Sequence, residues 1–312
     1  MASLTAAQSR HVKTAEQHLK EAKKLLTTSF TKWSKDYLMA GPEYAKAATA
    51  FRLAKQLSRA VDCYLSAVDC AVKSGQAFEV AKYRDLAAQV LCKNKDEPSQ
   101  RRAAGLYEES LQASLSMEDF IGAADVAQKA AAIWTKIDPA RGITLYRDTI
   151  EQLQNVGKGM YTLEMYRNAV ALAIRAERWA MARDMTVSAI SGFVEAGRPP
   201  SAVFSWHLTE IILLAKIGDT VALDETFLES LGTRGYGKSD QAEAAEEINR
   251  GIKDRDEERL SNVMSLRGMT HGGLHRDVMQ LARSMWGQNS AQSRQRASQR
   301  ASQQQRPGRA PG

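Results

Sequence analysis

The stretch GTRGYGKSD, residues 232–240, has the residue types and spacing of a loop that binds nucleotide phosphates. Gly232 begins a G-x-x-x-x-G-K-[ST] pattern that Gly237, Lys238 and Ser239 complete, and such a loop holds phosphates with its backbone N–H groups. A working loop of this kind follows a buried strand. The residues before it, DTVALDETFLESL, instead have the pattern of an amphipathic helix. We therefore predict a connection between two helices, with Ser239 or Asp240 as the N-cap of the second, and not a nucleotide hydrolase.

The histidines and cysteines form no pattern that indicates a metal site. His271 and His275 are four residues apart in HGGLH, but the two glycines between them disfavour a helix that would aim both rings at one metal ion. Cys63, Cys70 and Cys92 are an odd number of cysteines without close pairs, which argues against a zinc site and against a disulfide framework. We predict no catalytic residue, no metal site and no cofactor.

The composition favours helices. The chain has 312 residues, 44% of them apolar, with only 7 prolines, and Ala, Leu, Glu, Lys, Arg and Gln dominate most windows. Of the net charge of +7, five arginines in residues 288–312 contribute +5, so the rest of the chain gives no reason to expect nucleic-acid binding. No apolar run reaches the ~18 residues of a transmembrane helix and no signal peptide is recognisable, which predicts a cytoplasmic protein.

Two interleaved series of large apolar residues repeat along the chain with a period of about 40 residues. Together the two series run from residue 51 to residue 227, and small residues, mostly alanine, recur between the large ones. The first series is Phe51, Leu91, Trp134, Ile174 and Leu214, and the second is Tyr64, Tyr107, Tyr146, Met185 and Phe227. Two series with one period are typical of a helix hairpin repeated about five times, in which each hairpin covers the apolar stripe of its neighbour.

These patterns predict an all-α fold, a right-handed α-solenoid of TPR-like helix hairpins with a C-terminal helical cap. We expect the hairpins in residues 1–232 and the cap in residues 233–287, where the 40-residue rhythm stops. Residues 288–312 are rich in Gln, Ser, Arg and Ala, and this composition predicts a disordered basic tail.

The segment LLTTSFTKWSKDY, residues 25–37, follows a first helix expected from Ala6 to Leu26 and is open to two interpretations. Its apolar residues could fold back and cap the first hairpin. They could instead enter a membrane interface, helped by neighbouring lysines, with a gain of about 1.5–3 kcal/mol for each side chain that is buried. The apolar residues are Leu25, Leu26, Phe30 and Trp33, and the lysines are Lys23, Lys24, Lys32 and Lys35.

Residues 30–62, FTKWSKDYLMAGPEYAKAATAFRLAKQLSRAVD, resemble the soluble NSF attachment proteins (SNAPs), most of all the gamma form. The similar pattern is F-x-K-W-x-x-D-Y followed by E-Y-x-K-A-A-x-A-F-x-x-A-K-Q. Weaker similarity continues to about Gly287 and includes NRGIKDRDEERLSNV. The resemblance thus covers nearly all of the chain except the tail.

The resemblance implies a function that periodicity alone does not. SNAPs are adaptors without catalytic activity. Several copies wrap a SNARE four-helix bundle and recruit NSF, a hexameric AAA+ ATPase, at the cytosolic face of vesicle, Golgi and target membranes. The family's loop after the first helix touches the membrane, so the resemblance favours a membrane contact for Leu25, Leu26, Phe30 and Trp33. The alternative is a helical-repeat scaffold subunit of a different multiprotein assembly.

The resemblance also assigns charged residues, with some departures. Lys55 and Lys93 fall where family members place basic residues facing the SNARE bundle. Asp254, Asp256, Glu257 and Glu258 fall at the end of the chain that faces the ATPase. Two family positions that are basic hold Asp119 and Asp125 here, and Arg250 occupies a position that is often acidic. The basic tail also lacks the family's usual acidic, leucine-ending terminus, which leaves the strength of NSF stimulation open.

Overall fold

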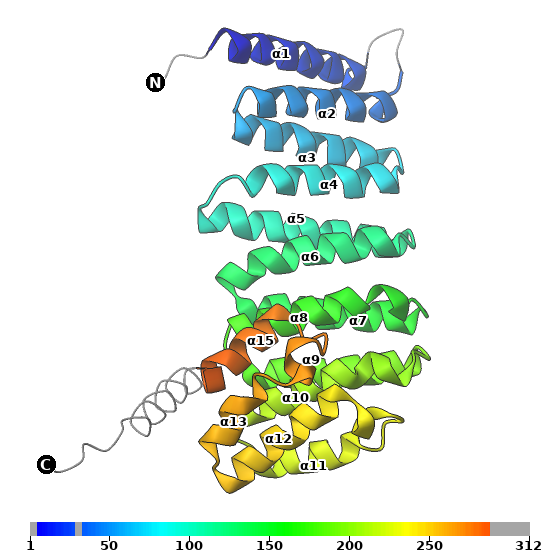
Figure 1. Cartoon of the computed structure of the whole chain (residues 1–312). Helices are drawn as coiled ribbons and strands as arrows, with labels where there is room; N and C mark the ends of the chain where they lie inside the picture. The colour runs from blue at the N-terminus through cyan, green and yellow to red at the C-terminus, as the bar shows by residue number, and fades with distance from the viewer. Residues whose placement is uncertain (1–4, 29–32, 288–312) are drawn as a thin grey trace, which may run out of the picture. The chain divides into compact units, whose positions relative to one another are not determined.

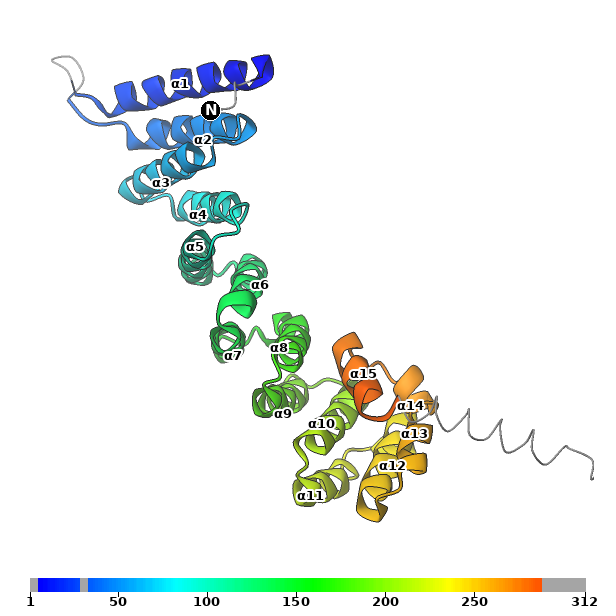
Figure 2. The same ribbon diagram turned by 90° about the vertical axis from the view of Figure 1, so that its left-hand side faces the viewer.

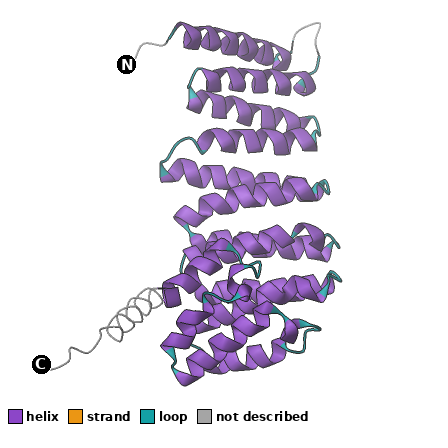
Figure 3. Ribbon diagram, viewed as in Figure 1, coloured by secondary structure: helices purple, strands orange, loops and turns teal. Residues whose placement is uncertain are grey.

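The computed structural model describes residues 5–28 and 33–287, and throughout these residues the regular structure is helical (Figures 1 and 3). The all-α prediction is confirmed. Phe30, Lys32 and the basic segment 288–312 lie outside the described residues. The chain divides into two compact units, residues 1–161 and residues 162–312. The predicted change from hairpins to cap, at residue 232, therefore lies inside the second unit.

The first unit is a stack of antiparallel helices, each packed on the next in sequence (Figure 1). Within it, α3, α5 and α7 form one layer while α4 and α6 form the other (Figure 2). The helices are α1 (Ala6–Leu26), α2 (Tyr37–Leu53), α3 (Leu57–Lys73), α4 (Ala77–Leu91), α5 (Glu97–Ser116), α6 (Phe120–Ile137) and α7 (Pro139–Asn155), followed by the 3₁₀ turn η1 (Gly159–Tyr161).

The second unit begins with two more hairpins and continues with further helices in residues 240–287, within the range expected for the cap. The hairpin helices are α8 (Leu163–Arg175), α9 (Trp179–Glu195), α10 (Phe204–Ile217) and α11 (Thr220–Ser230), with the turn η2 (Pro200–Val203) before α10. After the turn η3 (Tyr236–Lys238) come α12 (Asp240–Asp254), α13 (Glu257–Val263), α14 (Arg267–Thr270), α15 (Arg276–Ala282) and the π-helical turn η4 (Arg283–Gly287). In the cap, α12 packs on α10 and α15 packs on α8 (Figure 2).

The repeat predicted from spacing is the core of the protein. All ten anchor residues of the two series are buried, from Phe51 in α2 to Phe227 in α11. Fully buried alanines such as Ala47, Ala67 and Ala87 lie in the helix contacts, where a small side chain lets two backbones approach closely. A large anchor and a small neighbour together fill each contact to the density of a protein interior.

Most hairpin turns end the first helix in the same way, with a residue of positive φ. At Lys55, for example, φ is 62°, and the N–H of Gln56 donates to the carbonyl of Phe51 at 2.9 Å. The same bond from the next residue to a carbonyl five positions back recurs after Gly75, Glu118, Gly157, Glu177, Gly197 and Arg255. Four of the seven positions are not glycine, so the turn geometry is kept even where a side chain makes it unfavourable.

Candidate partner-binding sites

The predicted SNARE-facing lysines lie at the same edge of the first unit. Lys55 is in the α2–α3 turn and Lys93 is in the α4–α5 connection. Both turns follow even-numbered helices, which run in the same direction, so the two turns come to one side of the stack (Figure 1). Both side chains are exposed, and neither forms an ion pair with any residue that the structure describes.

Two further lysines extend this edge, Lys95 after α4 and Lys136 in the last turn of α6. Both are exposed and form no ion pair within the described ranges. We call Lys55, Lys93, Lys95 and Lys136 the basic edge. Sequence reasoning missed Lys95 and Lys136, although their position at the end of an even-numbered helix repeats that of Lys55 and Lys93.

Two carboxylates among these lysines serve as helix caps. Asp96 accepts the N–H of Ser99 at 2.9 Å, and this backbone hydrogen bond lowers the pKa of the Asp96 carboxyl. Asp138 accepts the N–H of Arg141 at 3.2 Å. Capping ties each carboxylate to the positive end of its own helix, so the lysines remain the charges available to a partner.

The two acidic residues at family-basic positions have local explanations. Asp119 is the N-cap of α6 and accepts the N–H of Gly122 at 2.9 Å. Asp125 Oδ2 lies 2.8 Å from the Nζ atom of Lys129, one turn further along α6. Since the charge of Asp125 is paired and Asp119 has a capping role, neither makes this part of the unit strongly acidic.

The predicted membrane-contact residues divide into two groups. Leu25 and Leu26 are the last residues of α1 and pack, partly buried, against a cluster that includes Ala22, Ala40 and Tyr44. Trp33 is 89% exposed in the connection to α2, and Phe30 lies outside the described residues. The structure therefore brings the two leucines into the core of the first hairpin and leaves the tryptophan accessible.

The predicted NSF-facing residues all lie at one turn. Asp254 is the last residue of α12, Asp256 is the N-cap of α13, and Glu257 and Glu258 follow in its first turn. Asp256 is used locally, because it accepts the N–H of Arg259 at 2.9 Å. Asp254, Glu257 and Glu258 are exposed and form no ion pair in the described part of the chain. We call these three carboxylates the acidic turn.

Arg250, the basic residue at a position often acidic in the family, lies one turn before the acidic turn in α12. Its guanidinium forms an ion pair with Glu246 and lies 4.0 Å from Glu247. These two carboxylates offset the charge of Arg250, so the acidic turn keeps its negative character.

The loop that matches the phosphate-binding pattern joins two helices, as the sequence predicts. α11 ends at Ser230, the turn η3 follows, and Ser239 is the N-cap of α12, accepting the N–H of Ala242 at 3.1 Å. No strand precedes the loop anywhere in residues 33–287. Tyr236 is fully buried and contacts the rings of Phe204 and His207 at 5.4 and 5.0 Å between centroids. The central residue of the loop therefore anchors it to α10, and the strand that a nucleotide site needs is not there.

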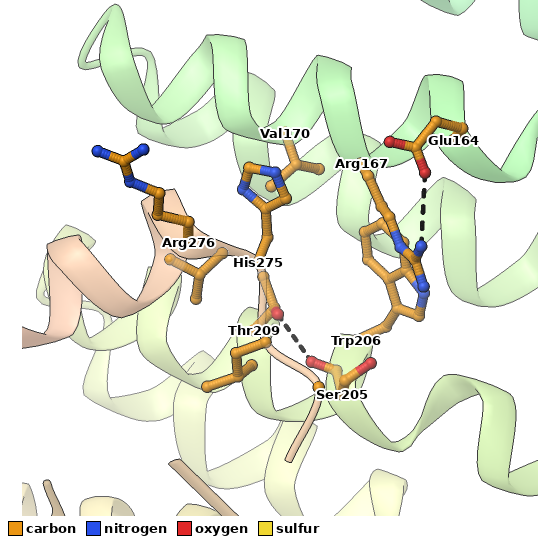
Figure 4. A pocket seen from close by; sticks show the side chains of 11 residues that line it. Glu164, Arg167, Val170, Ser205, Trp206, Thr209, His275 and Arg276 are labelled. Carbon is orange, nitrogen blue, oxygen red and sulfur yellow. Dashed lines mark hydrogen bonds and ion pairs between the residues drawn. The ribbon is translucent and has the colours of Figure 1, made fainter. Parts of the chain in front are cut away.

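A cavity of about 340 Å³ lies in the second unit where residues 273–278 fold back onto α8 and α10 (Figure 4). Sequence reasoning missed this cavity, because its walls come from three distant segments. Its lining combines apolar side chains, hydroxyls and guanidinium groups, and includes Arg167, Val170, Ser205, Trp206, Thr209 and Arg276. Arg167 is partly neutralised by Glu164, with 3.4 Å between Nη1 and Oε2.

Ser205, His275 and Asp277 lie near this cavity but do not form a nucleophilic triad. The Nδ1 atom of His275 lies 3.4 Å from Asp277 Oδ2, but as the N-cap of α15 it accepts the backbone N–H of Asp277 at 3.2 Å and so does not donate to the carboxylate. A triad needs Nδ1 to donate to the acid and the other ring nitrogen to face the serine. In Figure 4 the imidazole of His275 points toward Val170 and away from Ser205. Its role here is to begin the helix.

Comparison with known proteins decides the family. The family model described as "Soluble NSF attachment protein, SNAP" matches residues 6–264, most of the 312-residue chain. The chain belongs to the soluble NSF attachment protein family. The matched range includes the basic edge, the α1–α2 connection and the acidic turn.

Two curated SNAPs are similar over most of their length. The gamma-soluble NSF attachment protein of Dictyostelium discoideum is 24% identical over 250 residues, 80% of this chain and 76% of that protein. The gamma-soluble NSF attachment protein of Arabidopsis thaliana is 23% identical over 274 residues, 86% of this chain and 91% of that protein. The resemblance to the SNAP family that residues 30–62 indicate is thus confirmed.

Solved structures show weaker likeness. BtubC from P. vanneervenii is 15% identical with a TM-score of 0.39, covering 80% of this chain and 92% of that one. Aspartyl phosphate phosphatase F of Bacillus subtilis is 15% identical with a TM-score of 0.31, covering 93% and 72%. At these low scores neither likeness says anything about the activity of this SNAP.

Membership of the SNAP family implies a non-enzymatic role as an NSF attachment adaptor in SNARE disassembly. None of the described helices is long and apolar enough to cross a membrane. Within the described residues, no group of three or more His, Cys, Asp or Glu side chains is arranged to hold a metal ion.

Proposed function

We propose that this SNAP binds assembled SNARE four-helix bundles and recruits an NSF-type AAA+ hexamer that takes them apart, while attached peripherally to the cytosolic face of a membrane. The family match over residues 6–264 carries the proposal. The charged residues described above support it, because Lys55, Lys93, Asp254, Glu257 and Glu258 are all exposed.

The SNARE contact is assigned to the basic edge, with Lys55 and Lys93 as its first two members. Four unpaired ammonium groups on successive turns suit a rod-like acidic partner better than a compact one. Contacts of this kind set orientation and association rate and weaken as salt screens them.

The NSF contact is assigned to the acidic turn, with Asp256 fixing the start of α13. Asp254, Glu257 and Glu258 come from two successive helices and meet at one sharp connection. Such a compact cluster of unpaired carboxylates suits a basic surface on the ATPase. The membrane contact is assigned to Trp33 and Phe30.

The deciding experiment is a pull-down of this protein with assembled SNARE bundles at about 50 mM and about 300 mM salt, where the Debye length falls severalfold. We expect binding at low salt that weakens at high salt. The double variant Lys55→Gly, Lys93→Gln should bind several-fold more weakly. Glycine is chosen at position 55 because φ there is 62°, so the charge is removed without straining the turn.

The matched control is Lys13→Gln, Lys20→Gln, which removes two exposed, unpaired lysines from α1. It should bind as the wild type does. Equal losses in both double variants would assign the effect to net charge and not to the basic edge. Absence of binding to every SNARE bundle at low salt would refute the adaptor function. Stable co-purification with other subunits, without release on ATP hydrolysis, would indicate the scaffold alternative.

The NSF contact has its own test, the triple variant Asp254→Asn, Glu257→Gln, Glu258→Gln. We expect it to bind SNARE bundles normally but to recruit less NSF in a ternary pull-down. The control removes three exposed carboxylates elsewhere in the second unit, Glu225→Gln, Glu229→Gln, Glu243→Gln. The assignment is wrong if the control variant loses as much NSF as the acidic-turn variant.

A further inference from the structure

The second residue of each even-numbered helix in the first unit is large, apolar and exposed. These residues are Leu38 in α2, Phe78 in α4 and Ile121 in α6, and they are 56%, 64% and 68% exposed. The second residues of α3, α5 and α7 are Ser58, Pro98 and Ala140, all small or conformationally suited to a helix start. Within the first unit, the apolar choice is thus confined to the starts of the even-numbered helices, whereas in the second unit the second residue of α11, Val221, is also 68% exposed.

The usual residue preferences of the first helical turn do not explain these apolar residues. The first turn of a helix carries unsatisfied N–H groups and a partial positive charge, so acidic residues are favoured there. Leu38, Phe78 and Ile121 add nothing to capping, and their exposure to water is unfavourable. An exposed apolar residue occupies this helix position three times, although acidic residues are preferred there. This repetition indicates a contact with a partner outside the chain.

The three residues belong to a longer row at the same edge. This edge holds the α1–α2, α3–α4, α5–α6 and α7–η1 connections and lies opposite the basic edge in the first unit (Figure 1). The exposed large apolar residues there, which we call the apolar edge, are Trp33, Leu38, Met39, Val72, Phe78, Ile121, Val156 and Met160. At the opposite edge, the described residues contain one exposed large apolar side chain, Leu53.

Three exposed lysines lie along the apolar edge. Lys35, Lys73 and Lys158 lie in or beside these connections and are exposed, without an ion pair to a described residue. Lys73 lies 5.1 Å from the ring centroid of Tyr37 and Lys158 lies 5.3 Å from that of Phe120, so each of these two ammonium groups lies close to an aromatic ring.

Three of the carboxylates nearby are engaged within the protein. Asp36 accepts the N–H of Met39 at 3.0 Å and Asp119 accepts that of Gly122 at 2.9 Å, both as helix caps. Glu79 lies 3.2 Å from the Nζ atom of Lys82. Glu118 forms no ion pair within the described ranges, and neither do the exposed Asp69 and Glu151, which lie about one turn before the ends of α3 and α7. The apolar edge therefore carries both unpaired lysines and unpaired carboxylates.

We propose that the apolar edge docks the first unit on a lipid bilayer, with Leu38, Phe78 and Ile121 inserted among the headgroups. The row is continuous with the exposed Trp33 of the proposed membrane contact, and single apolar side chains at separate helix ends can each enter a lipid interface. A protein partner would need a continuous packed patch instead. The inference rests on the proposed peripheral attachment and extends it from one loop to four successive connections.

The test is co-sedimentation of the full chain with vesicles of phosphatidylcholine containing about 30% phosphatidylserine, compared with pure phosphatidylcholine. The triple variant Leu38→Ser, Phe78→Ser, Ile121→Ser should lower the partition coefficient about tenfold or more, since each side chain contributes apolar burial. The control Leu53→Ser, at the opposite edge and 54% exposed, should bind as the wild type does. Circular dichroism checks that the variants keep their helicity.

A second measurement does not depend on the triple variant folding. In a Cys92→Ser background, the variants Ile121→Cys and Leu53→Cys carry an environment-sensitive fluorophore, while Cys63 and Cys70 are buried. Anionic vesicles should shift the emission of the label at 121 to shorter wavelength and leave the label at 53 unchanged. The same shift at both positions, or at neither, would overturn the proposal.

Two further outcomes also overturn the proposal. One is vesicle binding that is unchanged in the triple variant. The other is a wild-type protein that self-associates through this edge, with the triple variant losing only self-association in sedimentation experiments. Binding to soluble SNARE bundles is measured without lipid. The proposed adaptor function and the proposed lipid contact can therefore be refuted independently of each other.

Discussion

The Nζ atom of Lys129 in α6 lies 3.0 Å from Oδ1 of Asp85 in α4, and this ion pair joins successive helices of one layer. The other Asp85 oxygen accepts the Nε2 amide of Gln89 at 2.8 Å. Desolvation of Lys129 opposes its charge, but the bonds from Asp125 and Asp85 outweigh it and raise the Lys129 pKa. The two carboxylates therefore stabilise the charged form of Lys129 against its partial burial.

Lys129→Met should lower the free energy of unfolding by about 1–2 kcal/mol, because it leaves Asp85 partly buried without its cation. Methionine keeps a similar apolar side chain, so the loss in the free energy of unfolding measures the contribution of the ammonium charge. The control is Asp125→Asn, which removes the more exposed partner and should cost less than about 0.5 kcal/mol. Urea denaturation of both variants measures the difference. Equal effects would mean that Asp85 is not the important partner.

Glu177→Gly should stabilise the protein by about 0.5–1 kcal/mol, since φ at this turn residue is 56° and glycine adopts that conformation without strain. Gly197→Ala should have the opposite effect of similar size, because φ is +64° and no atom lies within 4 Å to complicate the substitution. Thermal melts of the two variants measure both changes. A Glu177→Gly protein less stable than the wild type would contradict the role of turn strain.

The free energy of unfolding should fall as the pH is lowered, because His207 is buried in its neutral form. Burial lowers the pKa of His207 to about 4, below its usual value near 6.5, so the folded state favours the neutral ring. Its contribution is fully present above pH 6.5 and is lost as the pH falls toward 4, by about 2 kcal/mol at pH 5. The ring also bonds Thr233 Oγ1 at 2.9 Å.

His207→Gln should flatten this pH dependence, because glutamine can bond the same hydroxyl without titrating. Urea unfolding of the wild type and of His207→Gln is measured at pH 7 and at pH 5. Since the two proteins share every other titrating group, the difference in their pH dependence is the contribution of the imidazole. Parallel losses in both proteins would place the acid sensitivity elsewhere.

Trp33 and the two leucines before it should respond differently to substitution. Trp33→Ser should leave the melting temperature unchanged, because the side chain is 89% exposed, while recruitment to anionic liposomes falls by about fivefold. Leu25→Ser, Leu26→Ser should lower stability by about 2 kcal/mol, because both side chains pack on the core of the first hairpin. Unchanged recruitment in Trp33→Ser would exclude the tryptophan from the membrane contact.

Much of the fold is predictable from local sequence. The anchors from Phe51 to Phe227 have one period because each hairpin must bury the same kind of stripe, and all are buried in the structure. The helix start at Ser239 is also local, since a cap acts within one turn. The family follows from residues 30–62, where the matching side chains are close in sequence.

The functional surfaces depend on the fold. Lys55 and Lys136 belong to one edge only because even-numbered helices run in the same direction. Leu26 and Trp33, seven residues apart, have opposite environments because α1 ends between them. The pairing of Lys129 with Asp85 spans 44 residues, a distance at which neither residue constrains the other until the helices pack.

The sequence by itself determined the helices, their order, the repeat and the family, because helix period, caps and apolar anchors are properties of short segments. The tertiary structure decided which charges remain unpaired, which leucines are buried and which helix ends share an edge. Those outcomes depend on contacts between residues far apart in the chain, and such contacts exist only once the hairpins stack.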